Sequence, residues 1–135
     1  MLSRNFLCVY TDDLRVSRDW YVNLLGYETD FDSDWFVHLR APDNDLVELG
    51  IMLRHNALIP QACRTQAGGG MLTVILDDVD AAYRRAMTAG ARIIEPPRDL
   101  FYGQRRMLIK DPNGMVVDVS SPCEPDPQWL ASLQS

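Results

Sequence analysis

The sequence contains the same local pattern twice, and this internal repeat limits the possible folds more than any other feature. Asp13 follows an apolar run and precedes a helix-like segment that closes with a glycine, and Asp78 repeats this arrangement 65 residues later. Late in each half a polar turn leads into a strand with one carboxylate, Glu48 in the first half and Asp118 in the second. Such a repeat predicts two copies of one unit that pack face to face and enclose a shared groove.

Hydrophobic periodicity and turn residues predict the order βαβββ in each half, an α+β fold. Pro60 and a glycine triplet indicate a linker between the halves. We therefore expect a single domain over 1–135 with module one at 4–53, a linker at 54–69, module two at 70–122 and a C-terminal tail at 123–135. The expected strands are 4–10, 27–31, 34–40, 45–53, 70–76, 92–95, 100–110 and 115–120, and the expected helices run to about Leu25 and over 78–89.

Composition excludes several classes of partner. The net charge of −6 repels phosphate backbones, so nucleic acid is not expected as a partner. No apolar run reaches the roughly 18 residues that a membrane helix needs, and the first residues lack the apolar core of a secretory signal. Three distant cysteines without a CxxC pair indicate reduced thiols in a cytoplasmic protein, and Cys8 is expected to be a small buried residue.

Several longer motifs can be recognised in both halves. They are Trp20-Tyr21 with Leu24-Leu25-Gly26, Tyr102-Gly103-Gln104-Arg105, Lys110-Asp111-Pro112-Asn113-Gly114 and Val117-Asp118-Val119. With these motifs, residues 4–122 resemble the vicinal oxygen chelate superfamily, which includes glyoxalase I, extradiol dioxygenases, fosfomycin-resistance enzymes and bleomycin-resistance proteins. The motifs of the second half are most similar to those of the metal-free drug-binding members. The resemblance implies a cup built from two βαβββ modules and a homodimer, either domain-swapped or side by side.

The resemblance also implies where a metal ion would bind, because enzymes of this superfamily take ligands from the first and last strand of each half. Counting back from each helix cap places Phe6 and Met71 at the first-strand positions, and Glu48 and Asp118 occupy the last strands. A phenyl ring and a thioether are not ligands for the ions these enzymes use. We therefore expect no metal and no other cofactor. The alternative is a divalent ion such as Zn, Ni, Mn or Fe held by Glu48, Asp118 and His38.

An apolar and aromatic cup with one carboxylate from each half remains. Planar ligands stack on aromatic rings, and carboxylates attract a cationic group, so a cationic aromatic small molecule is the expected ligand. Two simpler interpretations stay open: the carboxylates pair with Arg105 or Arg106, and His38 is a half-buried histidine bonded to a neighbour. The predicted ligand-binding residues are Phe6, Tyr10, His38, Glu48, Met71, Tyr102, Arg106 and Asp118.

Three functions are compatible with this cup. The first and favoured one is a metal-independent protein that binds a drug-like or aromatic metabolite, as the bleomycin-resistance branch does, without catalysis. The second is a metal-dependent glyoxalase, lyase or dioxygenase that polarises vicinal oxygens of its substrate. The third is a regulatory or partner-binding module whose cavity is vestigial.

Overall fold

The computed structural model describes residues 1–134, which form two compact units. The first unit comprises residues 1–69 and 111–115, and the second comprises residues 70–110 and those from 116 onward. Each unit contains a four-stranded sheet with a helix against one face. Within residues 1–134 no helix is long and apolar enough to span a bilayer.

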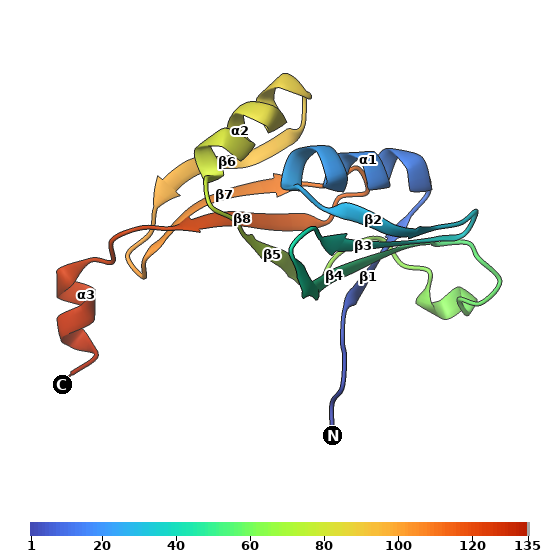
Figure 1. The fold of residues 1–135 in the computed structure, drawn as a ribbon, viewed down its shortest axis with the longest axis horizontal. Coiled ribbons are helices and arrows are strands. Elements are labelled where there is room, and N and C mark those ends of the chain that lie inside the picture. The colour runs from blue at the N-terminus through green and yellow to red at the C-terminus, as the bar shows by residue number, and fades with distance from the viewer. Residues whose placement is uncertain (135) are drawn as a thin grey trace. The chain divides into compact units, whose positions relative to one another are not determined.

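The first unit has the predicted βαβββ order (Figure 1). Its sheet order is β1-β4-β3-β2, so the first and last strands are neighbours, and they run parallel. This adjacency places residues from the two ends of the module on one surface. The elements are β1 (Leu7–Thr11), α1 (Leu14–Leu25), β2 (Glu28–Asp32), β3 (Phe36–Ala41) and β4 (Asn44–Leu53).

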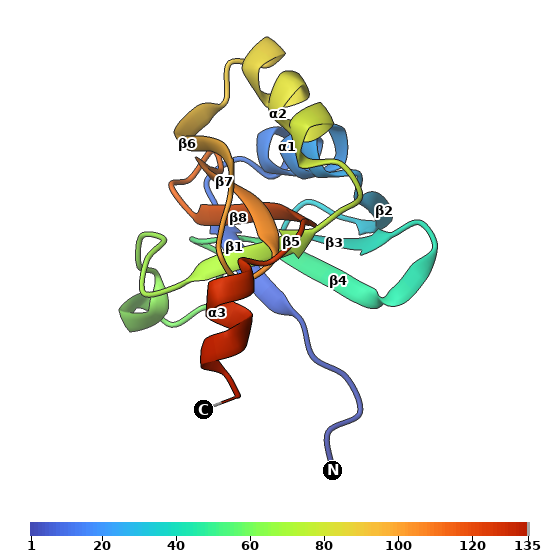
Figure 2. The same cartoon turned by 90° about the vertical axis from the view of Figure 1, so that its left-hand side faces the viewer.

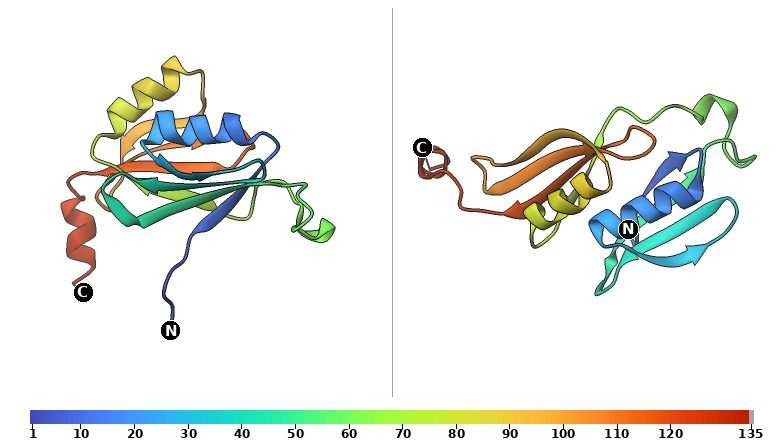
Figure 3. Two further views of the ribbon diagram at one scale, coloured as in Figure 1. Left: turned by 45° about the vertical axis from the view of Figure 1, so that its right-hand side comes forward. Right: turned by 90° about the horizontal axis from the view of Figure 1, so that it is seen from above.

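Both ends of α1 are fixed by the residues that the sequence indicates. The Asp13 side chain accepts a hydrogen bond of 3.1 Å from the backbone N–H of Val16, which satisfies one of the free N–H groups of the first turn. Gly26 ends the helix at φ 85°, a left-handed conformation that favours glycine. Figure 3 shows α1 across one face of its sheet. The core between them contains Tyr21, Leu24, Leu25, Val37, Leu39, Leu49 and Ile51, all buried.

The second unit repeats this topology with the sheet order β5-β8-β7-β6, and β5 and β8 are parallel. Asp78 caps its helix as Asp13 does, accepting from the N–H of Ala81. The predicted α+β fold of two βαβββ modules is therefore confirmed. The elements are β5 (Met71–Ile75), α2 (Val79–Thr88), β6 (Arg92–Asp99), β7 (Gln104–Lys110), β8 (Val116–Pro122) and α3 (Pro127–Ser132).

The predicted turn between β7 and β8 is present and belongs to the first unit. Asp111 Oδ1 accepts hydrogen bonds from the backbone N–H groups of Asn113 (2.8 Å) and Met115 (2.9 Å). Its other oxygen accepts from the buried hydroxyl of Tyr21 on α1 at 2.7 Å. The carboxylate of Asp111 thus shapes the turn and ties it to α1.

The structure differs from the sequence predictions in several places, including the starts of β1 and β7, the end of β6, the linker and Cys8. Strand β7 begins at Gln104 rather than at residue 100, because a turn with Gly103 at φ 100° separates it from β6. A short 3-10 turn, Gln61–Cys63, lies within the expected linker. The prediction that Cys8 is buried is wrong: its side chain faces away from α1 and is exposed. In the C-terminal tail, Trp129 of α3 lies edge-on to Phe101 with ring centroids 5.5 Å apart.

Candidate ligand-binding site

The first sheet has one face that α1 does not cover, here called the helix-free face. Side chains alternate along a strand, and residues such as Val9, Leu39 and Leu49 are buried toward α1. Their sequence neighbours therefore point the other way. The pairing of the strands brings these neighbours side by side. The helix-free face comprises Cys8, Tyr10, Phe36, His38, Arg40, Glu48, Gly50 and Met52.

Glu48 is the best-covered carboxylate of this face, with a side chain only 8% exposed. Arg4 Nε donates to both of its oxygens, at 2.9 and 3.0 Å, and Arg4 Nη2 donates to Oε1. His38 Nε2 lies 2.8 Å from Oε1. The hydrogen bonds from Arg4 lower the pKa of Glu48; burial acts against this, and the bond from His38 adds to it. Glu48 is thus held as a carboxylate.

His38 has a carboxylate at each ring nitrogen. Its Nδ1 lies 2.9 Å from Asp30 Oδ2 and its Nε2 faces Glu48, while Arg4 Nη2 is 3.2 Å from the same Nε2. Each ring nitrogen of His38 therefore lies within hydrogen-bond distance of a carboxylate oxygen, and the ring links Asp30 to Glu48. The hydrogen bonds to neighbouring side chains match one sequence-based interpretation of His38, but the residue is buried, at 7% exposed, rather than half-buried.

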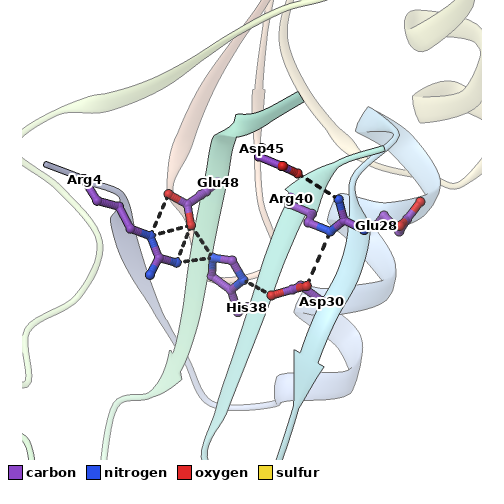
Figure 4. A network of polar contacts seen from close by, with 7 residues as sticks. All are labelled: Arg4, Glu28, Asp30, His38, Arg40, Asp45 and Glu48. Carbon is purple, nitrogen blue, oxygen red and sulfur yellow. Dashed lines mark hydrogen bonds and ion pairs between the residues drawn. The ribbon is translucent and has the colours of Figure 1, made fainter. Parts of the chain in front are cut away.

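A second group of charged side chains, around Arg40, lies next to His38 (Figure 4). Arg40 donates to Asp45 and to Glu28, each at 3.1 Å, and its Nε lies 3.4 Å from Asp30 without hydrogen-bond geometry. We call the seven residues of Figure 4 the Glu48 cluster. They are Arg4, Glu28, Asp30, His38, Arg40, Asp45 and Glu48.

Phe6 supplies the aromatic part of the site. Its ring lies edge-on to the His38 ring with centroids 5.4 Å apart. The guanidinium carbon of Arg4 lies 5.0 Å from the centroid of the Phe6 ring, within the range of a cation–π contact. Three of the predicted ligand-binding residues, Phe6, His38 and Glu48, are therefore brought together in the first unit.

Two adjoining grooves lie at this cluster. One, of about 440 Å³, is lined by the N-terminal residues 2–5 with Asp45, Leu46 and Glu48. The other, of about 320 Å³, is lined by Arg4, Asp45 and Glu48 together with Asp30, His38 and Arg40. Arg4, Asp45 and Glu48 line both grooves.

A larger groove of about 540 Å³ lies elsewhere in the first unit, between Thr11, Trp35 and His55. Its carboxylate Asp12 is paired with Arg54 at 2.5 Å, and His55 is exposed to solvent. This groove has no buried polar pair comparable to that of His38 and Glu48. We therefore place the candidate site at the Glu48 cluster.

The predicted residues of the second unit are placed on their own sheet. Met71 is half exposed, and β5 pairs with β8 so that Thr73 stands beside Asp118. Asp118 is buried and accepts from the hydroxyls of Thr73 (3.2 Å) and Ser120 (2.6 Å). Arg106 pairs with Glu95 at 3.1 Å.

The remaining predicted residues have separate surroundings. Tyr10 lies on the helix-free face of β1, and Tyr102 lies in the turn before β7, edge-on to Phe101. Arg105 pairs with Asp80 and Asp99. The arginines expected as partners of Glu48 and Asp118 thus pair with other carboxylates, because nearer groups satisfy each of them.

Sequence reasoning missed Arg4 and Asp30. Arg4 stands two residues before Phe6, so alternation along the chain already assigns both to one face. Asp30 lies at a bulge of β2: Thr29 pairs with Leu39 and Phe31 with His38, so Asp30 is an extra residue between two consecutive pairs. No sequence signal marks such a bulge.

The metal-ligand alternative draws on both units, through Glu48, His38 and Asp118, and stays a prediction. Residues 1–134 contain no group of three or more His, Cys, Asp or Glu side chains arranged to hold a metal ion. The donor chemistry at the predicted positions also fits a metal poorly. Phe6 and Met71 provide no hard donor, and the oxygens of Glu48 and Asp118 already accept hydrogen bonds.

Comparison of the sequence with known proteins identifies its family. Residues 4–119 match the model of the Glyoxalase/Bleomycin resistance protein/Dioxygenase superfamily. An uncharacterised protein of Mycobacterium bovis is 30% identical over 116 residues, covering 76% of this chain and 72% of that protein.

Solved structures agree in fold. A member of this superfamily from Sphaerobacter thermophilus superposes with a TM-score of 0.72 at 23% identity, covering 90% of this chain and 98% of that one. A glyoxalase/bleomycin resistance protein/dioxygenase from Nocardioides has a TM-score of 0.66 at 25% identity, covering 94% and 90%. The family model matches most of the chain, and the structure has the repeated βαβββ units. The chain therefore belongs to the Glyoxalase/Bleomycin resistance protein/Dioxygenase superfamily.

Proposed function

We propose that the protein binds a small aromatic ligand with a positive charge and that this binding needs no metal ion. The observation that carries the proposal is the pairing of a covered carboxylate, Glu48, with the ring of Phe6 through one intervening cation, Arg4. This arrangement is already a receptor for a positively charged group next to an aromatic surface. A ligand that combines both features matches it.

A metal ion at the Glu48 cluster would compete with hydrogen bonds that its donors already make. His38 is the nitrogen donor of this cluster, and both of its ring nitrogens face carboxylates. Coordination would have to replace one of these contacts, and two carboxylates with one histidine would have to converge. We therefore derive no catalytic step through a metal ion.

A metal-dependent glyoxalase, lyase or dioxygenase is the second candidate. The observation in its favour is that His38 Nε2 and Glu48 Oε1 are only 2.8 Å apart, so a nitrogen and an oxygen donor of the alternative ligand set are neighbours. The ligand set expected from the sequence also includes Asp118, which belongs to the second unit. The two candidates differ in whether stripped protein binds metal tightly.

A fluorescence titration tests the first candidate. Proflavine, a planar aromatic cation, is titrated into chelator-treated protein, with an uncharged coumarin of similar size as the comparison ligand. We expect proflavine to bind in preference to the coumarin, and Glu48→Gln to weaken it by about tenfold or more, as for a lost charge-assisted contact.

Asp43→Asn is the matched control, since it removes the same charge from an exposed turn. Equal weakening by Glu48→Gln and Asp43→Asn would reduce the effect to net charge and contradict the site. Equal binding of the coumarin and proflavine would contradict the cationic ligand.

We also propose that the protein forms a homodimer, the assembly that the family resemblance implies. Light scattering at micromolar concentration gives the mass directly. A dimeric mass supports the proposal, and the 15.3 kDa mass of one chain overturns it.

A further inference from the structure

Arg4 covers Glu48 from a segment that has no regular structure. Residues 1–6 precede β1 as an extended coil (Figure 2). The side chain of Arg4 is 58% exposed, whereas that of Glu48 is 8% exposed. The acceptor Glu48 therefore belongs to a strand of the sheet, whereas the donor Arg4 belongs to an exposed terminal segment without regular structure.

Arg4 lies at both grooves of the cluster. The grooves of about 440 and 320 Å³ both have Arg4, Asp45 and Glu48 in their walls, and their linings together reach from Leu46 to His38. A ligand group that took the place of the Arg4 side chain at Glu48 would therefore border both grooves.

Charge in the cluster favours a replacement cation once Arg4 has left. Among residues 1–134, the remaining ion-pair partners of these carboxylates are then Arg40, which faces Glu28, Asp30 and Asp45, and His38, which faces Asp30 and Glu48. Glu48 keeps its contact with His38, and the oxygens that Arg4 leaves can accept hydrogen bonds from another donor. A flat group with two N–H donors on one edge restores the paired hydrogen bonds of Arg4, and Phe6 offers it the same ring face.

We propose that the Glu48 cluster is a binding subsite for a planar amidinium or guanidinium group and that Arg4 is its internal occupant, which the ligand displaces. The inference rests on the proposed function and gives the chemical class of the ligand's charged group. A ligand can bind only to the molecules in which Arg4 has left Glu48, so its apparent affinity is reduced in proportion to that fraction. Removing Arg4 should therefore tighten binding.

Calorimetric titration with benzamidine tests the displacement, with benzamide as an uncharged probe of nearly the same shape. We expect Arg4→Ala to bind benzamidine about tenfold or more tightly than the wild type does, with benzamide affected little. Arg18→Ala is the control, since Arg18 pairs with Asp19 and Asp32 on the other face of the unit, and its affinity should equal that of the wild type. The double variant Arg4→Ala/Glu48→Gln should lose the gain.

Equal affinity of the wild type and Arg4→Ala overturns the inference, as does a gain that survives in the double variant. A gain shared by Arg18→Ala and Arg4→Ala reduces the effect to net charge and overturns it as well. Binding of benzamidine that depends on Glu48 but not on Arg4 would contradict the displacement while leaving the proposed function intact. Failure of proflavine to bind, by contrast, contradicts the proposed function whatever benzamidine does.

The wild-type protein provides a second readout that needs no substitution. The Arg4 Nε–H group, bonded to Glu48, gives its own NMR cross-peak. Saturating benzamidine should move this peak to the position of a solvated arginine, and benzamide should leave it in place. An Arg4 peak that stays unchanged while benzamidine binds overturns the displacement.

Discussion

At the scale of single residues, the charge on Glu48 is set by its neighbours rather than by solvent. Arg4 supplies two kinds of donor nitrogen and His38 a third, and together they favour the ionised carboxylate. The pKa of Glu48 is accordingly lowered from its ordinary 4.5. This shift links the site to the stability of the whole unit.

The expected consequence is an acid-sensitive stability. A carboxylate whose folded pKa lies below its unfolded value stabilises the protein above the unfolded pKa, here about 4.5, and this contribution is lost as pH falls through the folded pKa. Urea unfolding across this range should therefore show a falling free energy of unfolding in the wild type and a shallower fall in Glu48→Gln. Identical pH slopes for the two proteins would show that the Arg4 and His38 contacts do not favour the ionised form.

Some residues at the Glu48 cluster could be expected from the sequence and others could not. Glu48 and the neighbouring Phe6 were expected at the site from the repeat and the family resemblance, and His38 was expected as an alternative donor. Strand alternation assigns Arg4 to the face of Phe6, although the strand as assigned begins only at Leu7. Asp30 does not follow from any pattern, since a bulge in β2 decides which residue faces His38.

At the scale of elements, α1 depends on a polar contact with the turn between β7 and β8. Tyr21 is fully buried, and its hydroxyl donates to Asp111, which is also buried. Burial is the first cause that raises the pKa of Tyr21, and the charge of Asp111 is the second. The contact therefore joins a neutral phenol to a buried carboxylate.

Replacing Tyr21 with Phe should lower the free energy of unfolding by about 1–3 kcal/mol, because a buried carboxylate oxygen of Asp111 loses a donor. Chemical denaturation measures the difference. Tyr83→Phe on α2 is the control for loss of a phenolic hydroxyl. A Tyr21→Phe protein as stable as the control variant would mean that water replaces the hydroxyl at no cost.

The end of α1 makes a prediction of its own. Gly26 has φ 85°, and a methyl group added there meets no atom within 4 Å, so a substitution is opposed only by backbone strain. Gly26→Ala should therefore destabilise the protein by about 1 kcal/mol. Gly68→Ala, which also meets no atom but lacks a left-handed backbone, should be close to neutral in the same thermal unfolding experiment. Equal melting temperatures of the two variants would contradict the assignment of strain.

At the scale of the whole molecule, two units share one topology while their helix-free faces carry different chemistry. Asp13 and Asp78 cap equivalent helices, and the parallel pairs β1–β4 and β5–β8 are equivalent. The covered carboxylates differ: Glu48 accepts from a guanidinium and an imidazole, whereas Asp118 accepts from two hydroxyls. Of these two carboxylates, Glu48 is the one that is paired with an arginine.

The fold was predictable from sequence because local signals repeat and agree. Aspartate caps, glycine after the first helix and the Asp111–Gly114 turn fix element order, and apolar alternation fixes the buried faces. The start of β7 was not predictable, because β6 continues through Pro96 and Pro97 to Asp99 and displaces the turn. Solved relatives at 22–25% identity share this fold, and a fold of this kind hosts many chemistries.

We propose above that the Glu48 cluster binds a cationic ligand without a metal ion. The most direct test is calorimetric titration of chelator-stripped protein with Zn, Ni, Mn, Co and Fe(II) in turn. We predict that no metal ion binds the protein more tightly than in the millimolar range. His38 and Glu48 should then stay bonded to each other and to Arg4. Tight binding of one ion per chain, abolished by Glu48→Ala or His38→Ala, would contradict it and identify a metal-dependent enzyme instead.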